Sequence, residues 1–450
     1  MKRLADNSVL ACVLAISLSG CAGLSAGLPH RPPGPSSLEQ HTRRAQASPI
    51  DHVVIIVQEN RSTDNLFHHL PGADTADSGM NSEGQVIQLQ PVALAARYDL
   101  EHTHESFIAE YDNGKMDGAD LVKCKGHPCP QNPQFVYVNQ SDVAPYFEMA
   151  QTYTFGDRMF ETNQGPSYPA HQYLIAGTSQ PSVGSNLLAV DSPERPGGGS
   201  GGSAGCTAPS GTLVDMIDQN GNPAPPAYPC FEHPTLMDLL DSAQIKWRYY
   251  ASGPSSVWTG PNSIRHIRFG NDWRKVIIPE TKVLSDISNG TLAPVTWVMP
   301  PGLSSDHPGS TDGSGPSWVA SIVNGIGNSP YWGKTAIFVL WDDWGGFYEH
   351  VPPSDIFNSN EVGLRVPLIV ISPYAKPAYV SHVNHEFGSI LHFVETNFGL
   401  PSLGYSDSRS DDMSDCFNYL QVPLTFHTIQ APLHGDYFRR GVPQTPPDDY

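Results

Sequence analysis

The chain has 450 residues, of which 39% are hydrophobic and only 16% charged, and it contains 41 glycines and 42 prolines. This composition excludes a disordered chain or a coiled coil and indicates a loop-rich globular protein with a large core. The formal net charge of −20 argues against a nucleic-acid partner, because few basic groups can neutralise a phosphate backbone, although a local cation can still create a phosphate site.

The N-terminus has the features of a secretory signal. Lys2 and Arg3 precede an apolar stretch at residues 9–16 that is too short to span a membrane. Leu18-Ser19-Gly20-Cys21 resembles a bacterial lipobox, in which the cysteine carries the lipid, and the alternative is an ordinary signal peptide with an incidental cysteine. We expect a lipoprotein signal peptide at residues 1–20 and a Pro-rich tether at 21–49. The protein would then be extracytoplasmic, either attached to the bacterial envelope (periplasmic or outer membrane) through Cys21 or secreted.

The cysteines beyond Cys21 favour the same compartment. Cys124 and Cys129 are close enough to close a small loop, and Cys206 could pair with Cys230, but spacing alone does not determine connectivity. A zinc site at Cys124 and Cys129 is the alternative, although no second ligand pair stands at zinc-finger spacing. Oxidised cysteines in an extracytoplasmic protein are the better interpretation.

Apolar runs alternate with helix-like patterns along residues 50–450, which we interpret as one domain with a flexible Gly-rich insertion at about 193–205. The runs are continuous, as in central strands that are covered on both faces. This alternation predicts an α/β fold, a three-layer α/β/α sandwich with a mostly parallel central sheet. The expected strands are 52–57, 247–250, 295–299, 335–340 and 366–371, and the expected helices are 146–152, 235–243, 317–326 and 385–398.

Polar side chains follow three of these strands. Ligands of open α/β sheets bind beyond the carboxyl ends of the strands, so these positions are where a site is expected. The residues concerned are Glu59 and Asn60 after the first strand, Asp306 and His307 after the third, and Asp342 and Asp343 after the fourth.

The pair Asp342-Asp343 is informative because adjacent carboxylates repel each other and are costly to bury. A hard cation between them removes that cost, and Gly345 and Gly346 allow the backbone to turn closely around them. The alternative is a solvated acidic turn. Carboxylate ligands at the other strand ends favour the cation.

Gly165-Pro166-Ser167-Tyr168-Pro169 precedes an apolar helical pattern. Pro169 suits the first turn of a helix, so we expect Ser167 to lie just before the helix begins. A hydroxyl at that position is commonly an N-cap. The same position also faces the positive end of the helix dipole, where a phosphate can be held, and a serine beside a metal becomes a nucleophile.

Four blocks of residues together resemble the bacterial phosphoesterase family, which contains phosphatidylcholine-type phospholipases C and related acid phosphatases. They occur in the family's order along the chain. The blocks are Glu59-Asn60-Arg61-Ser62-Thr63-Asp64-Asn65-Leu66-Phe67, Asp99-Leu100-Glu101-His102, Gly165-Pro166-Ser167-Tyr168-Pro169 and Asp342-Asp343-Trp344-Gly345-Gly346-Phe347-Tyr348-Glu349-His350.

The resemblance implies an alkaline-phosphatase-like fold and hydrolysis of phosphoric esters through a phosphoserine. It implies one divalent metal held by Glu59, Asn60, Asp342 and Asp343 with Ser167, the nucleophile. His102, Asp306 and His307 would surround the phosphate, and His102 or His307 would protonate the leaving alcohol. An oxygen-rich ligand set suits Ca²⁺, Mg²⁺ or Mn²⁺ better than Zn²⁺.

Departures from the family pattern leave the substrate open between phosphomonoesters and phosphodiesters, with phospholipid head groups among the candidates. The phospholipase branch usually has Pro-Asn-Arg after the nucleophile, where this chain has Pro169-Ala170-His171, which favours the acid-phosphatase-like branch. A sulfatase is disfavoured because the arginine of its motif is missing. A non-catalytic surface lipoprotein with the same fold is the other alternative.

The remaining histidines carry less information. His68 and His69 follow Phe67 in an expected loop, and we interpret both as surface or packing residues rather than ligands. His171 lies about one helical turn after Ser167, so a role as a ligand and a role in packing are both open. The role of His350 is open as well.

Overall fold

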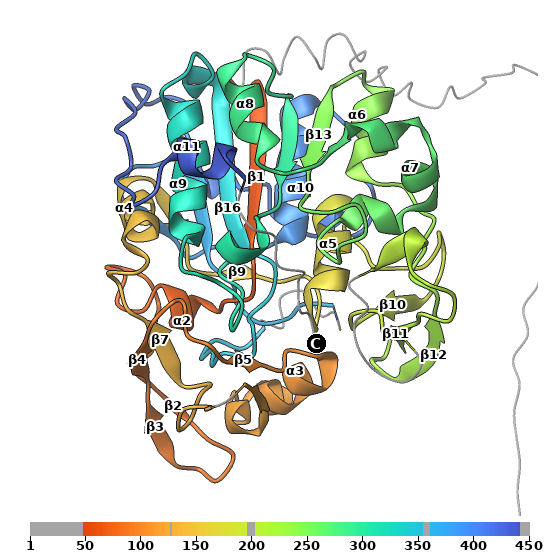
Figure 1. Ribbon diagram of the computed structural model, residues 1–450, viewed down its shortest axis with the longest axis vertical. Coiled ribbons are helices and arrows are strands. Elements are labelled where there is room, and N and C mark those ends of the chain that lie inside the picture. Colours follow the sequence, from red (N-terminus) through yellow and green to blue (C-terminus); the bar gives the residue numbers. More distant parts are fainter. Residues whose placement is uncertain (1–47, 127, 196–202, 354–360, 442–450) are drawn as a thin grey trace, which may run out of the picture.

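The computed structural model describes residues 48–126, 128–195, 203–353 and 361–441 (Figure 1). The predicted signal peptide, Cys21 and nearly all of the predicted tether lie outside the described residues. Residues 196–202 of the predicted Gly-rich insertion also lie outside them. Among the described helices, none combines the length and the apolar character needed to cross a membrane.

A central sheet of eight described strands organises the fold. It contains all five predicted strands, within one or two residues at each end. In spatial order the strands are β14 (Val276–Ile277), β13 (Trp247–Tyr250), β15 (Val295–Val298), β1 (His52–Gln58), β16 (Thr335–Trp341), β17 (Leu368–Ile371), β8 (Thr154–Gly156) and β18 (Tyr379–Ser381).

The predicted mostly parallel sheet is confirmed, because among the described strands of the central sheet only β17 runs against its neighbours. The predicted strand 366–371 begins late, at Leu368, since the Val366 N–H donates to the carbonyl of Met159 and not to a neighbouring strand of this sheet.

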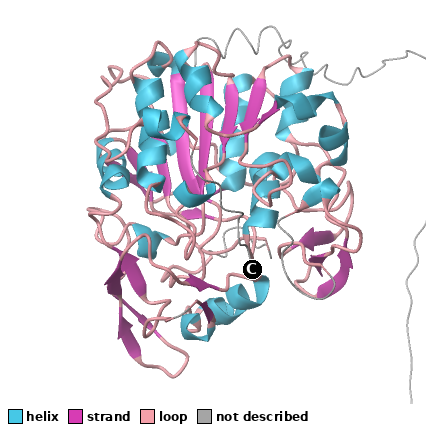
Figure 2. Ribbon diagram, viewed as in Figure 1, coloured by secondary structure: helices cyan, strands magenta, loops and turns pink. Residues whose placement is uncertain are grey.

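Helices cover both faces of the sheet, which confirms the predicted α/β/α layering (Figure 2). Figure 1 shows α8, α9 and α11 in front of the sheet and α10 behind it. The described helices are α2 (Thr63–Leu66), α3 (His104–Tyr111), α4 (Ala144–Thr152), α5 (Ser167–Ala176), α6 (Leu236–Ser242), α7 (Arg265–Phe269), α8 (Lys282–Ser288), α9 (Gly315–Gly327), α10 (Phe387–Phe398) and α11 (Gly435–Arg439).

The predicted helices correspond to α4, α6, α9 and α10, with each boundary within two residues of the predicted one. The predicted helix 385–398 begins at Phe387, because His385–Glu386 forms the short strand β19, which pairs with β9. The Glu386 N–H then donates to Ser389 Oγ (3.1 Å), so Glu386 precedes the helix as its cap.

Small sheets formed by the intervening loops lie beyond the central sheet (Figure 1). Together with α3 they occupy the side toward which the central strands point, and this explains why the residues at those strand ends are buried. The strands are β2 (Ser78–Met80) with β3 (Val86–Gln88), β4 (Gln90–Val92) with β7 (Val136–Val138), β5 (Asp99–Leu100) with β6 (Cys124–Lys125), β9 (Met159–Phe160) with β19, and β10 (Leu187–Ala189), β11 (Val214–Asp218) and β12 (Pro223–Ala227).

The two disulfides considered from the sequence are present. They join Cys124 to Cys129 and Cys206 to Cys230, and Cys416 is a buried free cysteine.

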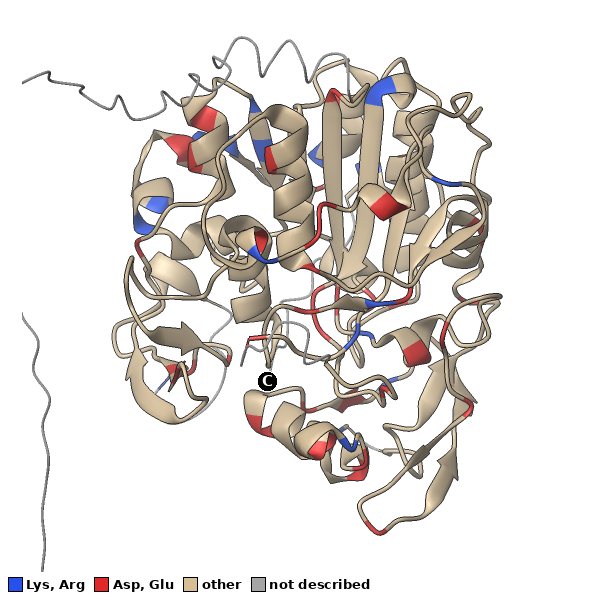
Figure 3. Ribbon diagram, turned by 180° about the vertical axis from the view of Figure 1, so that it is seen from behind, with Lys and Arg blue, Asp and Glu red and all other residues tan. Residues whose placement is uncertain are grey.

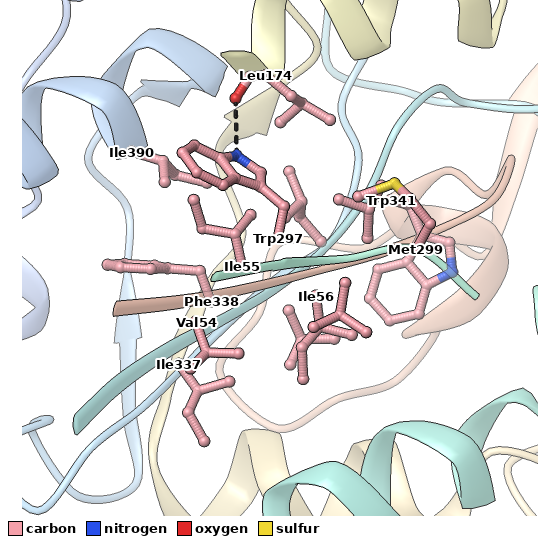
Figure 4. Close-up of a cluster of buried hydrophobic side chains, with 14 of the residues drawn as sticks. Val54, Ile55, Ile56, Leu174, Trp297, Met299, Ile337, Phe338, Trp341 and Ile390 are labelled. Carbon is pink, nitrogen blue, oxygen red and sulfur yellow. Dashed lines mark hydrogen bonds between the residues drawn. The ribbon is translucent and has the colours of Figure 1, made fainter. Parts of the chain in front are cut away.

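The core on one face of the sheet ties α5 to the strands. The register pairs Ile55 with both Trp297 and Phe338, so the three side chains point to the same face. On that face the Trp297 indole N–H donates to the Leu174 carbonyl of α5 (3.1 Å), as Figure 4 shows. The position of α5 relative to the sheet therefore depends on a fully buried indole.

Trp297→Phe should lower the free energy of unfolding by about 1–3 kcal/mol, because a buried carbonyl loses its donor and a small void replaces part of the indole. Urea unfolding followed by circular dichroism measures the change. Trp332→Phe is the matched control, since the Trp332 indole also donates to a carbonyl but is only partly buried, and its loss should cost less. Wild-type stability for Trp297→Phe would contradict this account.

Candidate functional site

The register of two neighbouring strands brings the first and last motif blocks together. Parallel pairing sets Gln58 of β1 opposite Trp341 of β16, so Glu59 and Asp342 leave the sheet at the same level. The Asp342 N–H donates to the carbonyl of Gln58 (3.1 Å), and the Asn60 N–H donates to Asp342 Oδ1 (3.1 Å). Residues 283 apart in sequence thus become neighbours through strand pairing alone.

Ser167 is the first residue of α5, so the expectation that it precedes the helix is wrong by one residue. Pro166 has extended backbone angles and occupies the N-cap, and no side chain of the described residues caps the helix. The Ser167 hydroxyl is therefore directed to carboxylates, with Oγ 3.2 Å from Glu59 Oε2 and 3.3 Å from Asp343 Oδ2. The predicted nucleophile lies between two of the predicted ligands.

Asn60 links the carboxylates to His102. Asn60 has a left-handed backbone (φ 58°), and its Nδ2 donates to Asp343 Oδ2 (2.9 Å) and to His102 Nε2 (3.0 Å). His102 Nδ1 in turn donates to the carbonyl of Leu100 (2.8 Å), so the ring is neutral with its proton on Nδ1. Burial, and then the charge of His307, lower the pKa of His102 to about 3.

His171 joins this group, although the sequence left its role open. Its Nε2 lies 3.4 Å from Glu59 Oε1 and 3.5 Å from Asp342 Oδ2. Burial alone would raise the pKa of Asp342, but the neighbouring His171 imidazole lowers it. The spacing of four residues after Ser167 was the signal in the sequence, since it directs both side chains to the same side of α5.

The structure brings His307, but not the carboxylate of Asp306, toward His102. The His102 and His307 rings contact edge to face, with centroids 5.9 Å apart. Asp306 Oδ2 instead accepts hydrogen bonds from Tyr146 (2.7 Å), Gln58 (3.2 Å) and Trp341 (3.3 Å), away from Ser167. Burial raises the pKa of Asp306 to about 6.

These residues fit a divalent cation. Glu59, Asp342 and Asp343 are completely buried, and three buried carboxylates in contact require a compensating positive charge. Asn60 Oδ1 is also buried and accepts no hydrogen bond from any described residue, as expected of a ligand oxygen. One ligand atom each from Glu59, His171 and Asp342 lie within 4.8 Å of one another.

The surroundings of the carboxylates are crowded with further negative charge. Burial, and then the charge of Asp343, raise the pKa of Glu161 well above its ordinary value. Figure 3 shows acidic segments gathered where the central strands end. Glu161 was not selected from the sequence, where an isolated glutamate carries no distinguishing pattern.

His350 belongs to a separate buried cluster. Its Nδ1 lies 2.7 Å from Asp64 Oδ2, and the Arg365 guanidinium lies 2.6 Å from Glu349 Oε1 and 3.7 Å from Asp64 Oδ1. Arg365 neutralises this cluster from within the protein, so the cluster needs no added cation. It joins the first motif block to the last one and supports both.

A pocket of about 480 Å³ lies beside the site. Thr103, which follows His102, and Pro166, which precedes Ser167, both line it. Its charged lining residues are Glu105, Asp191, Glu194, Arg195 and Asp215.

Gly345 allows the close turn that the sequence predicts after Asp343. Its backbone is left-handed (φ 67°), and an added Cβ would lie 2.2 Å from the carbonyl oxygen of Asn60. Any side chain here would therefore displace Asn60 from the carboxylates.

Gly345→Ala should lower the free energy of unfolding by about 1–2 kcal/mol from the left-handed backbone alone, with a further cost from the contact with Asn60. Thermal unfolding of the purified variant measures the loss. Gly333→Ala is the matched control, because apart from its chain neighbours no described residue has an atom within 4 Å of its added Cβ. Equal losses for the two variants would show that the close turn is not needed.

The region that contains the four motif blocks is also the region that resembles known proteins. A model of the Phosphoesterase family matches residues 50–401. The non-hemolytic phospholipase C of Pseudomonas aeruginosa is 25% identical over 469 residues, a match that covers 90% of this chain and 62% of that protein. Phospholipase C B of Mycobacterium tuberculosis is 22% identical, with 83% of this chain and 78% of that protein covered.

Among solved structures, the chain aligns with a protein in the alkaline phosphatase superfamily from Vibrio parahaemolyticus. The TM-score is 0.36 at 10% identity, and the alignment covers 80% of this chain and 70% of that one. The chain spans less than two thirds of the length of the Pseudomonas phospholipase C. Since the family model extends over most of the sequence, the chain belongs to the Phosphoesterase family.

Proposed function

We propose that the protein hydrolyses phosphoric esters through a phosphoserine intermediate on Ser167, with one divalent cation. The observation that carries the proposal is the position of the Ser167 hydroxyl. It lies at the start of α5, within hydrogen-bond distance of carboxylates from the ends of two different strands. Membership of the Phosphoesterase family and the phospholipase C relatives support the same reaction class.

Glu59, Asn60, Asp342 and Asp343 would hold the cation, with Ser167 beside it. A divalent cation held there would favour the ionised form of the serine and neutralise charge on the phosphate. The oxygen-rich donor set favours Mg²⁺, Ca²⁺ or Mn²⁺. His171 would add a nitrogen ligand, which Mn²⁺ and Zn²⁺ accept more readily than Ca²⁺, so the choice among these ions depends on this residue.

The covalent chemistry takes place in two steps. Ser167 Oγ loses its proton toward a neighbouring carboxylate and forms a bond to phosphorus, while the bond from phosphorus to the alcohol oxygen breaks. The alcohol leaves with a proton. Water then attacks the phosphoserine and releases phosphate or a phosphomonoester, which restores the serine hydroxyl.

His307 is the better proton donor of the two histidines considered. In His102 the Nδ1 proton is held by Leu100, and Nε2 accepts from Asn60, so the ring orients the amide. His307 Nδ1 donates to the carbonyl of Pro308 (2.9 Å), which makes Nε2 the nitrogen that exchanges a proton. Asp306 acts in this scheme as a positioning residue, because its hydrogen bonds to Tyr146, Gln58 and Trp341 anchor the loop that carries His307.

The proposed location is extracytoplasmic, and the two disulfides support it, because they persist in oxidising compartments. Lipid attachment through Cys21 is part of the same proposal. A panel of an aryl phosphate, a phosphocholine ester and intact phosphatidylcholine, assayed side by side, distinguishes a phosphatase from a phospholipase C. The choline ester is an informative member, because four carboxyl groups line the pocket beside Ser167.

Ser167→Ala should reduce turnover of every accepted substrate by at least about a thousandfold while the protein stays folded, because the attacking oxygen is lost. Ser321→Ala is the matched control, a buried serine in α9 whose hydroxyl donates to the Ser317 carbonyl. Acid quenching during turnover, followed by peptide mass spectrometry, should find phosphate on the peptide that contains Ser167. Wild-type rates for Ser167→Ala would refute the proposed nucleophile.

Removal of divalent cations should abolish turnover, and adding back Mg²⁺, Ca²⁺, Mn²⁺ or Zn²⁺ one at a time should identify the ion that restores it. Asp342→Asn should weaken the affinity for that ion by about 10–100-fold or more, since even residues behind the ligands have effects of this size. Asp436→Asn, at an exposed aspartate of α11, serves as the control. Full activity in the presence of a strong chelator would exclude the cation.

A further inference from the structure

A second group of metal-binding side chains lies away from Ser167, at the end of the first motif block. His68 Nε2 and His69 Nε2 lie 3.1 Å and 2.6 Å from the same atom, Asp77 Oδ1. The three side chains place one ligand atom each within 4.8 Å of one another. Asp77 lies nine residues after His68, beyond a loop that contains Pro71 and Gly72.

The backbone brings two adjacent histidines to the same point. Side chains of consecutive residues ordinarily diverge, but His69 has a left-handed backbone (φ 64°), and its ring turns back over that of His68. The ring centroids are 3.7 Å apart. A left-handed backbone is uncommon for residues other than glycine, and such residues gather at functional sites.

Two of the three ligand residues are held by different parts of the structure. The His68 ring stacks on Tyr137 of β7, with centroids 3.9 Å apart and planes at 19°. The Asp77 carbonyl accepts the Leu89 N–H (2.9 Å) at the base of the β2–β3 hairpin. The region where α2, β2, β3 and β7 meet is visible in Figure 1. Packing therefore orients the His68 ring, and the hairpin fixes the backbone position from which Asp77 reaches it.

Solvent reaches the group from one side. The His68 side chain is 4% exposed, whereas those of His69 and Asp77 are 68% and 72% exposed. An ion can enter from the open side and complete its coordination with water, as in metal sites with three protein ligands.

We propose that His68, His69 and Asp77 form a second cation site, which takes a transition-metal ion of the Zn²⁺ class and is separate from the site at Ser167. Two imidazole nitrogens and one carboxylate oxygen suit Zn²⁺, Ni²⁺ or Cu²⁺, and they bind Mg²⁺ and Ca²⁺ poorly. The donor chemistry therefore differs from that of the oxygen-rich group around Ser167. The sequence favoured a surface role for both histidines, because nothing in it connects Asp77 to them.

An ion at this position would close the loop between His68 and Asp77. That loop carries Asp74, whose Oδ1 lies 3.1 Å from His350 Nε2 in the buried cluster of Arg365. Binding to the folded state alone stabilises it, so zinc should raise the unfolding temperature of the protein.

Zinc binding to the full-length protein carrying Asp343→Asn tests the proposal, because this change weakens the site at Ser167 and leaves the second group intact. Isothermal titration with Zn²⁺ and native mass spectrometry should find one bound ion. Adding His69→Ala or Asp77→Asn should weaken that binding by at least about tenfold and remove the zinc-dependent rise in unfolding temperature. His427→Ala, at an exposed histidine elsewhere, should change neither quantity.

In the otherwise wild-type background, His69→Ala should lower the zinc stoichiometry by one, which provides the test if Asp343→Asn does not fold. Ser167→Ala should abolish the proposed hydrolysis but leave the zinc ion at the second site bound. Loss of hydrolysis and loss of the second site are therefore separable results. The proposal would be overturned if neither His69→Ala nor Asp77→Asn changed the zinc affinity. It would also be overturned if the Asp343→Asn protein bound no ion, and the group would then contain only His–Asp ion pairs.

Discussion

The burial of three mutually repelling carboxylates is the constraint on which the rest of the structure depends. Glu59, Asp342 and Asp343 are completely removed from solvent, and Ser167 lies against two of them. Charges in such an environment are stable only when the geometry holds them around a positive partner. The parallel pairing of β1 with β16 supplies that geometry, because it ends both strands at the same level and leaves no freedom in how the two acidic segments meet.

Two buried acidic clusters, side by side, solve the same electrostatic problem differently. In the cluster of Asp64 and Glu349, the guanidinium of Arg365 lies between the carboxylates, with His350 at the edge. Around Ser167, His171 approaches two of the carboxylates at 3.4 and 3.5 Å. An internal arginine makes the first cluster a structural joint. A single imidazole against three carboxylates leaves the second cluster with excess negative charge, which fits the exchangeable cation that we propose there.

Left-handed backbone conformations after the strands set the directions of several side chains in the site. Asn60, Asp306 and Gly345 all follow strand ends and all have left-handed backbones. For Asn60 this turns the amide back toward Asp343 and His102. For Asp306 it places the carboxylate under Tyr146 while His307 continues toward His102. Residues other than glycine adopt this conformation at a cost, which the surrounding hydrogen bonds offset.

The sequence alone determined five of the eight described strands of the central sheet, their mostly parallel order, and the polar residues that follow three of them. These features are local, since continuous apolar runs specify buried strands and the chain order places Glu59 and Asp342 directly after them. The spacing of His171 after Ser167 already placed both on one side of a helix. Only the tertiary structure decided which carboxylates His171 meets, the turning of Asp306 away from Ser167, and the meeting of His68 and His69 with Asp77. Each of these depends on contacts between residues whose spacing carries no local pattern, so packing, rather than periodicity, decides where the side chains point.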